Sequence, residues 1–153
     1  MKAFIREVQP SDITELVRMG LEFFEYPGFG SPLLEFDPES FITHMEWLRL
    51  NHCLLVAEKE PGHLVGSISG IFHGWFLNKK VKCVTENWWW IDKEARGTFL
   101  AFDLLTALES WAREKGASIL LIASMNSNIR EKFARVMSHK GFSEIEFHFL
   151  KEL

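Results

Sequence analysis

Hydrophobic residues recur along this chain with the two spacings that distinguish helices from strands. Residues 10–25 and 101–115 carry apolar side chains every three or four positions, so each segment is predicted to form a helix with one apolar side. Asp37 is a good N-cap and Pro38 suits a first helical position, which predicts a further helix beginning there. A fourth helix is predicted over 128–139.

Several other segments lack the helical spacing and are predicted to be strands. Residues 54–58 and 64–72 flank a turn at 60–63 that contains proline and glycine, so the two segments should form an antiparallel hairpin. Residues 4–8 are predicted to form a short first strand, and 119–123 a buried strand after the long helix.

Residues 81–91 form the longest predicted strand, and alternation assigns its side chains to two faces. Ile145, Phe147 and Phe149 alternate in the same way and predict a last strand. One face of 81–91 is predicted to carry Val84, Glu86, Trp88 and Trp90, and the other Cys83, Thr85, Asn87, Trp89 and Ile91.

The predicted order is β-α-α-β-β-β-α-β-α-β, which describes an α/β fold. The chain has 153 residues, 47% hydrophobic and 25% charged, so one soluble globular domain over 1–153 is expected. We find no run long enough to cross a bilayer and no signal-peptide pattern, which favours the cytoplasm. Cys53 and Cys83 are expected to be buried free thiols.

The net charge of the chain limits the classes of partner that are expected. The formal net charge is −4 and the basic residues do not cluster, which argues against nucleic acid as the main partner, because phosphate binding needs clustered Lys and Arg. A membrane partner is not expected either, and a cationic or neutral amine fits the mild acidity better.

Residues 88–101 run from an apolar strand through a turn directly into the long helix. The first N–H groups of a helix have no partner within it and lie at the positive end of its dipole, so this junction is suited to hold an anion. Gly97 gives the turn flexibility, and Thr98 supplies a hydroxyl that can cap the helix.

The same residues resemble the acetyl-coenzyme A loop of the GNAT N-acetyltransferases. That family's pattern is Gln/Arg-x-x-Gly-x-Gly/Ala; Arg96 and Ala101 match it, and Phe99 replaces the middle glycine. The layout is closest to the small acetyltransferases often encoded in phage genomes. Further segments that carry the resemblance are Ile5-Arg6, Ser11-Asp12, Leu55-Val56-Ala57-Glu58, Val65-Gly66, Trp111-Ala112 and His139-Lys140-Gly141-Phe142.

The resemblance implies a GNAT fold with a mixed, mostly antiparallel sheet, and acetyl-coenzyme A as cosubstrate. It implies that the main chain of Ile91 and Lys93 bonds the pantetheine arm. The residues expected to hold the pyrophosphate are Arg96, Gly97, Thr98, Phe99, Leu100 and Ala101.

Glu86 is the predicted general base. An alkyl amine has a pKa near ~10 in water and must lose a proton before it attacks a thioester. Apolar neighbours on the strand would desolvate this carboxylate and raise its pKa toward a useful value. The alternative is a salt-bridged or solvated glutamate.

A general acid is harder to assign. The resemblance places a tyrosine at the position of Met137, and methionine has no proton to give. His139 is predicted to lie on a different side of its helix, and Tyr26, the single tyrosine, is a remote candidate. A thiol with a pKa near ~8.5 can leave as an anion, so catalysis does not require the missing acid.

Metal and nucleophilic chemistry have no support in the sequence, because the six histidines show no ligand spacing and no serine lies in a nucleophile motif. The predicted function is therefore acetyl transfer from acetyl-coenzyme A to a primary amine, of a small molecule or peptide, in a ternary complex. The alternative is a weak or inactive GNAT-fold protein that binds coenzyme A or a protein partner, favoured by Phe99 and Met137. The loop 26–35 is expected to contribute to acceptor choice, and the aromatic content makes a homodimer plausible.

Overall fold

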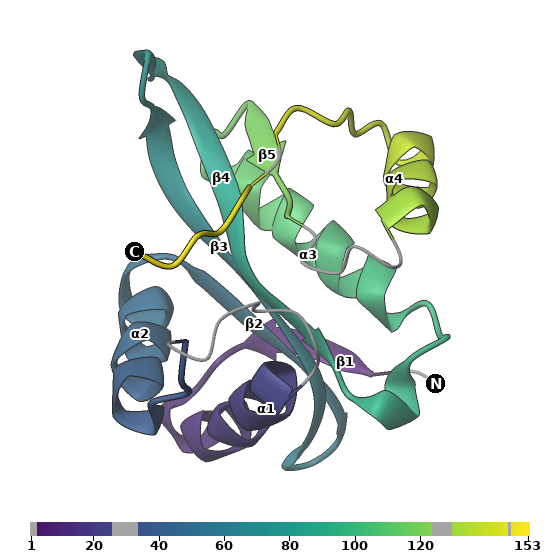
Figure 1. Cartoon of the computed structure of the whole chain (residues 1–153). Helices are drawn as coiled ribbons and strands as arrows, with labels where there is room; N and C mark the ends of the chain where they lie inside the picture. The colour runs from purple at the N-terminus through teal and green to yellow at the C-terminus, as the bar shows by residue number, and fades with distance from the viewer. Residues whose placement is uncertain (1–2, 26–33, 124–129, 147) are drawn as a thin grey trace.

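In the computed structural model, five strands form one sheet in the order β1-β2-β3-β4-β5 (Figure 1). The first four strands pair antiparallel, and β5 pairs parallel to β4. The structure describes residues 3–25, 34–123, 130–146 and 148–153. The strands are β1 (Phe4–Glu7), β2 (Cys53–Glu60), β3 (His63–Trp75), β4 (Asn78–Ile91) and β5 (Ile119–Leu121).

Helices cover both faces of the sheet, α1 and α2 on one and α3 on the other (Figure 1). The Asp37 carboxylate accepts a hydrogen bond from the Ser40 N–H at 3.0 Å, which confirms the predicted cap of α2. No helix among the described residues is both long and apolar enough to cross a membrane. The helices are η1 (Pro10–Asp12), α1 (Ile13–Glu25), α2 (Pro38–Asn51), η2 (Lys93–Ala95), α3 (Leu100–Glu114) and α4 (Arg130–His139).

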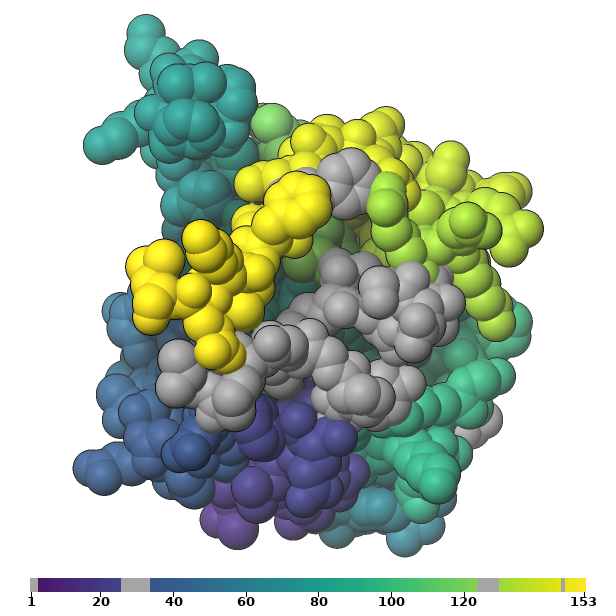
Figure 2. Space-filling view, viewed as in Figure 1, coloured from purple at the N-terminus to yellow at the C-terminus, as the bar shows by residue number. Residues whose placement is uncertain are grey.

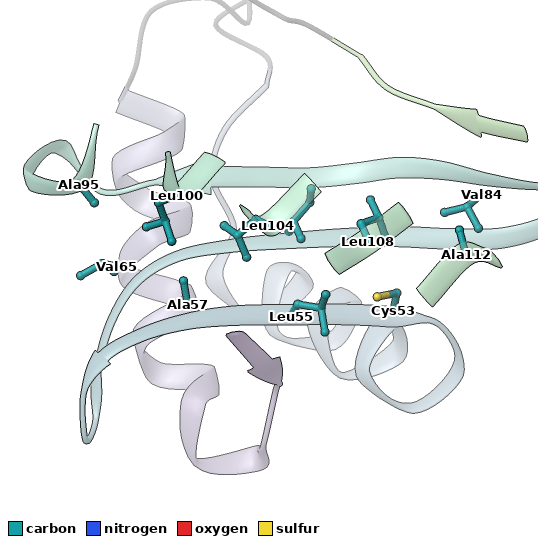
Figure 3. Close-up of a cluster of buried hydrophobic side chains, with 11 residues drawn as sticks. Cys53, Leu55, Ala57, Val65, Val84, Ala95, Leu100, Leu104, Leu108 and Ala112 are labelled. Carbon is teal, nitrogen blue, oxygen red and sulfur yellow. The ribbon is translucent and has the colours of Figure 1, made fainter. Parts of the chain in front are cut away.

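Two hydrophobic clusters lie on the opposite faces of the sheet. Figure 3 shows the cluster under α3, where side chains of β2, such as Leu55, point toward Leu104 and Leu108 of the helix. The other cluster joins α1 and α2 to the sheet and includes Trp88 and Trp90. Burial of both clusters is the main force that holds the helices in place.

A β-bulge in β4 corrects the predicted faces. Ser69 of β3 pairs with Trp88 and the next residue of β3, Gly70, pairs with Glu86, so Asn87 is an extra residue in β4. The extra residue reverses the alternation. Val84 and Glu86 therefore face α3, whereas Trp88 and Trp90 face α1 and α2. The prediction that all four share one face was wrong.

The predicted last strand is also wrong among the described residues. Residues 142–146 and 148–153 form no strand, and Ile145 and Phe149 are 74% and 95% exposed. A strand needs a partner along its length, and neighbouring β5 is short. Strand β5 was predicted to be buried, but its first residue, Ile119, is 40% exposed. Phe147 and the loop segment 26–33, with Tyr26, lie outside the described residues.

Cys53 and Cys83 are free and buried, as predicted. Burial raises the pKa of the Cys53 thiol to about 12, so this side chain is uncharged and unreactive at neutral pH.

Candidate functional site

The site begins where β4 loses its β5 partner. The two strands pair only between Cys83–Thr85 of β4 and Ile119–Leu121 of β5. Strand β4 continues to Ile91, so its outer edge from Glu86 onward has no strand beside it in the described part of the chain. Unpaired main-chain groups on a strand edge are ready to bond an extended ligand.

Alternation shows which main-chain groups face this edge. The Asp92 N–H donates to the Val65 carbonyl of β3 at 3.0 Å, so the main-chain N–H and C=O of Asp92 point toward β3. The N–H and C=O of one strand residue point to the same side, and neighbouring residues point to opposite sides. The N–H and C=O of Ile91 and Trp89 therefore face the open edge. Trp89 was not among the predicted binding residues, because its role here depends on main-chain direction.

Glu86 lies at the start of this edge, opposite Gly70, and faces α3. A Cβ at Gly70 would lie 2.6 Å from Val84 Cγ1 and 2.7 Å from Leu108 Cδ1, so only glycine fits beside the carboxylate. The Glu86 Oε2 accepts a hydrogen bond from the Ala123 N–H at 3.2 Å.

The surroundings of Glu86 change its acidity. Burial of the carboxylate raises its pKa from 4.5 to about 7, and the Ala123 hydrogen bond opposes the rise only in part. No ion pair joins Glu86 to a basic side chain in the described residues. A carboxylate of this kind accepts a proton readily near neutral pH.

The turn after β4 has the form expected of an anion-binding junction. Gly97 has a φ of +78°, which L side chains rarely adopt, and the space where a Cβ would stand is open. The Thr98 hydroxyl donates to the Ala95 carbonyl at 2.7 Å, and its oxygen accepts from the Leu100 N–H at 3.3 Å. The N-cap of α3 is Phe99 and not Thr98, so the Thr98 hydroxyl fixes the turn that leads into the helix instead of capping it.

Phe99 occupies the N-cap position of α3 and has no capping side chain. Its ring is 80% exposed, so it does not cover the main chain of the turn. The phenylalanine side chain therefore does not occupy the turn itself, although the Leu100 N–H of the first turn is already bonded to the Thr98 oxygen.

Arg96 is held against the end of β4. Its Nε donates to the Ile91 carbonyl at 3.0 Å, and its guanidinium lies 4.7 Å from the centre of the Trp90 ring. The cation is therefore positioned between the open edge of β4 and the start of α3. Lys93, in η2, is exposed on the same turn.

On the α1 and α2 side, the extra residue of β4 contacts α2. The Asn87 side-chain oxygen hydrogen-bonds His44 Nε2, and the His44 ring stacks on Trp47 at 5.5 Å. These residues lie beside a shallow surface hollow along α2. The hollow is lined by Asp37, Glu39, Ser40, Thr43, His44 and Trp47. No sequence pattern predicted the contact between Asn87 and His44, because this contact depends on the bulge.

The candidate positions for a general acid are Met137, His139 and Tyr26. Met137 is buried in α4, and its thioether offers no proton. His139 is exposed, with Nδ1 2.7 Å from the Arg135 carbonyl. Tyr26 lies outside the described residues. No group of three or more possible metal ligands occurs in the part of the chain that the structure describes.

The chain matches a known family in sequence and known structures in fold. Residues 19–135 match the model of the acetyltransferase (GNAT) family. A search among curated protein sequences finds no match.

Among solved structures, the chain is similar to an acetyltransferase of Trypanosoma brucei, with a TM-score of 0.75, 19% identity and coverage of 99% of this chain and 100% of that one. It is also similar to glucosamine-6-phosphate N-acetyltransferase from Arabidopsis thaliana, with a TM-score of 0.74, 18% identity and coverage of 99% of both chains. An aminoglycoside acetyltransferase from an uncultured soil sample, in complex with sisomicin, has a TM-score of 0.70, 18% identity and coverage of 99% and 96%.

Proposed function

The chain belongs to the acetyltransferase (GNAT) family, and from that premise we propose that it transfers an acetyl group from acetyl-coenzyme A to a primary amine. The observation that carries this proposal is the desolvated Glu86 carboxylate, with a pKa of about 7, at the point where β4 separates from β5. A base of this pKa is matched to deprotonating an amine near neutral pH.

The open edge of β4 and the turn that follows it fit the elongated cosubstrate. The main-chain groups of Trp89 and the N–H of Ile91 face that edge and suit the amide groups of a pantetheine arm, with Lys93 on the turn beyond; the Ile91 carbonyl accepts from Arg96. Two features suit the pyrophosphate: the positive end of α3 with the turn before it, from Gly97 to Ala101, and the fixed cation of Arg96.

In the proposed reaction the amine nitrogen attacks the thioester carbonyl within a ternary complex. Glu86 takes the proton that the amine must lose, directly or through one water molecule. The new C–N bond forms as the C–S bond breaks, and the electron pair leaves with sulfur as a thiolate. Holding the two reactants together supplies much of the rate enhancement.

No side chain of the described residues is assigned as general acid. Met137 occupies the position where the family resemblance places a tyrosine, and it cannot donate a proton. A thiol with a pKa near ~8.5 leaves as an anion at modest cost, so solvent can protonate it afterwards.

The acceptor is proposed to be a small-molecule or peptide amine whose reacting nitrogen meets Glu86 at the open edge of β4, while the rest of the acceptor lies on the α2 side. The hollow along α2 lies beside Asn87, the neighbour of Glu86 in β4, and Asp37 and Glu39 give it an acidic rim. A positively charged amine is attracted to such a rim. Two of the similar structures are of proteins named for acting on an amino sugar phosphate and on aminoglycosides.

Two measurements test the proposal in sequence. Calorimetry with acetyl-coenzyme A asks whether the purified protein binds the cosubstrate, and absence of binding at about millimolar ligand would refute the enzyme hypothesis. If it binds, a thiol-release assay with a panel of amines asks for turnover. Turnover that exceeds the rate without acceptor, and that falls in Glu86→Gln, is the expected result.

A second function is favoured by Phe99 and Met137 together. These residues replace a glycine and a tyrosine at two positions of the family pattern, and in this second function the fold binds coenzyme A or a protein partner with little catalysis. Binding of acetyl-coenzyme A without thiol release across the amine panel would support this alternative.

A further inference from the structure

The hairpin between β3 and β4 extends beyond the rest of the sheet. Strand β2 pairs with β3 only as far as Gly70, and β5 pairs with β4 only from Cys83. The hairpin beyond these points, residues 71–82, projects from the body (Figures 1 and 2). We call residues 75–82 the hairpin tip.

The hairpin tip is both apolar and basic. Trp75, Phe76 and Leu77 are 38%, 78% and 69% exposed. The next residues include Lys79, Lys80 and Lys82, and the tip contains no acidic residue, although the whole chain has a formal net charge of −4. Three adjacent large apolar side chains on a projecting turn are typical of a surface that another molecule covers.

The C-terminal segment, residues 142–146 and 148–153, has the complementary character. Ile145, Phe149 and Leu150 are 74%, 95% and 55% exposed, so their apolar surface is largely open to solvent. The segment's charged residues are Glu144, Glu146, Glu152 and Lys151, so it is acidic overall.

The apolar side chains of both surfaces remain exposed within one molecule. In the segment, Glu144 also lies 3.3 Å from Arg130 of α4, and Glu146 lies 3.7 Å from His148. Figure 2 shows the two surfaces on the same face of the molecule, with the C-terminal segment in yellow and the hairpin tip in teal. Surfaces that are complementary and lie on one face can meet twice across a two-fold axis, because each copy offers its tip to the other copy's segment.

We propose that two copies of this chain associate through these surfaces, with the hairpin tip of each packed on the C-terminal segment of the other. The apolar side chains supply burial, and the lysines of the tip face the glutamates of the segment. Attraction between opposite charges also sets which surfaces meet, because tip against tip and segment against segment both repel.

Sedimentation velocity between about 1 and 200 µM protein tests the proposal. The chain should form a dimer as its concentration rises, more weakly at high salt because ions screen the charges. Phe76→Ser with Leu77→Ser should raise the dissociation constant at least about tenfold. Arg113→Glu with Lys132→Glu, at exposed positions of α3 and α4, is the control for the charge variants of the tip described below and should leave the dissociation constant unchanged.

A charge-exchange experiment identifies the two surfaces directly. Variant one carries Lys79→Glu and Lys80→Glu, and variant two carries Glu146→Lys and Glu152→Lys. Each variant alone should be monomeric, because its two surfaces then have the same sign. Mixed together they should form a heterodimer, because each tip again meets a segment of opposite charge.

Circular dichroism of each variant excludes misfolding as the cause. A chain that stays monomeric at about 200 µM, or a dimer that all the tip and segment variants leave intact, would overturn the proposal. Sedimentation of a monomeric chain with anionic phospholipid vesicles, lost in Phe76→Ser with Leu77→Ser, would assign the tip to a lipid surface and overturn it equally.

Discussion

Glu86→Gln should make the protein less active and more stable at the same time. The amide cannot take a proton, so turnover should fall at least about tenfold, while acetyl-coenzyme A affinity stays the same because the carboxylate does not form the cosubstrate surface. The amide oxygen can still accept the Ala123 N–H, so the local structure should persist.

The stability gain follows from the raised pKa. Folding shifts the Glu86 pKa from 4.5 to about 7, so the folded state favours the protonated form. The stability that this group contributes is complete below pH 4.5 and is lost as the pH rises through about 7. At pH 8 the charged carboxylate costs about 3 kcal/mol relative to its protonated form, and glutamine avoids that cost.

Thermal unfolding at pH 4 and pH 8 measures the difference. The variant and the natural chain should melt within about 1–2 °C of each other at pH 4, and the variant should melt roughly 6–12 °C higher at pH 8. Glu114→Gln, at an exposed position on α3, is the control and should show no such dependence on pH. A difference in melting temperature that is the same at both pH values would show that Glu86 is not desolvated, and unchanged turnover would remove it from catalysis.

Three further results are expected. In the natural chain, kcat/KM should rise with pH through about 7 as Glu86 loses its proton, and a profile flat between pH 5 and 9 would refute its role as base. His44→Ala should raise the KM for the amine several-fold while calorimetry shows unchanged acetyl-coenzyme A binding, because His44 lies on the α2 side of β4; equal loss of both affinities would contradict that placement. Gly97→Ala should cost roughly 1–2 kcal/mol and weaken acetyl-coenzyme A binding, whereas Gly62→Ala, with the same left-handed backbone in the β2–β3 turn, should cost as much and leave binding unchanged.

Local patterns predicted most of the fold. The three- and four-residue spacing located α1 and α3, and Asp37-Pro38 located the start of α2, because these signals act within a few residues of one another. The hairpin of β2 and β3 was predicted for the same reason.

The failures arose where a feature depends on distant neighbours. Alternation alone cannot reveal the extra residue at Asn87, because a bulge is defined by the partner strand that it opposes. The pattern around Ile145 suits a strand, but a strand forms only beside another. The contact of His44 with Asn87 depends on both the bulge and the packing of α2, so sequence spacing could not predict it.

The extra residue in β4 also shifts which side chains of the strand reach each core. Before Asn87, Val84 and Glu86 face α3, and after it Trp89 and Ile91 do, while Trp88 and Trp90 pack under α1 and α2. Deleting Asn87 would make Glu86 and Trp88 neighbours, and ordinary alternation would then keep Glu86 toward α3 and Trp88 toward α1 and α2. A deletion would therefore preserve both cores and remove only the bulge, with its contact to His44, so the extra residue serves the α2 side of the site and not the packing of the sheet.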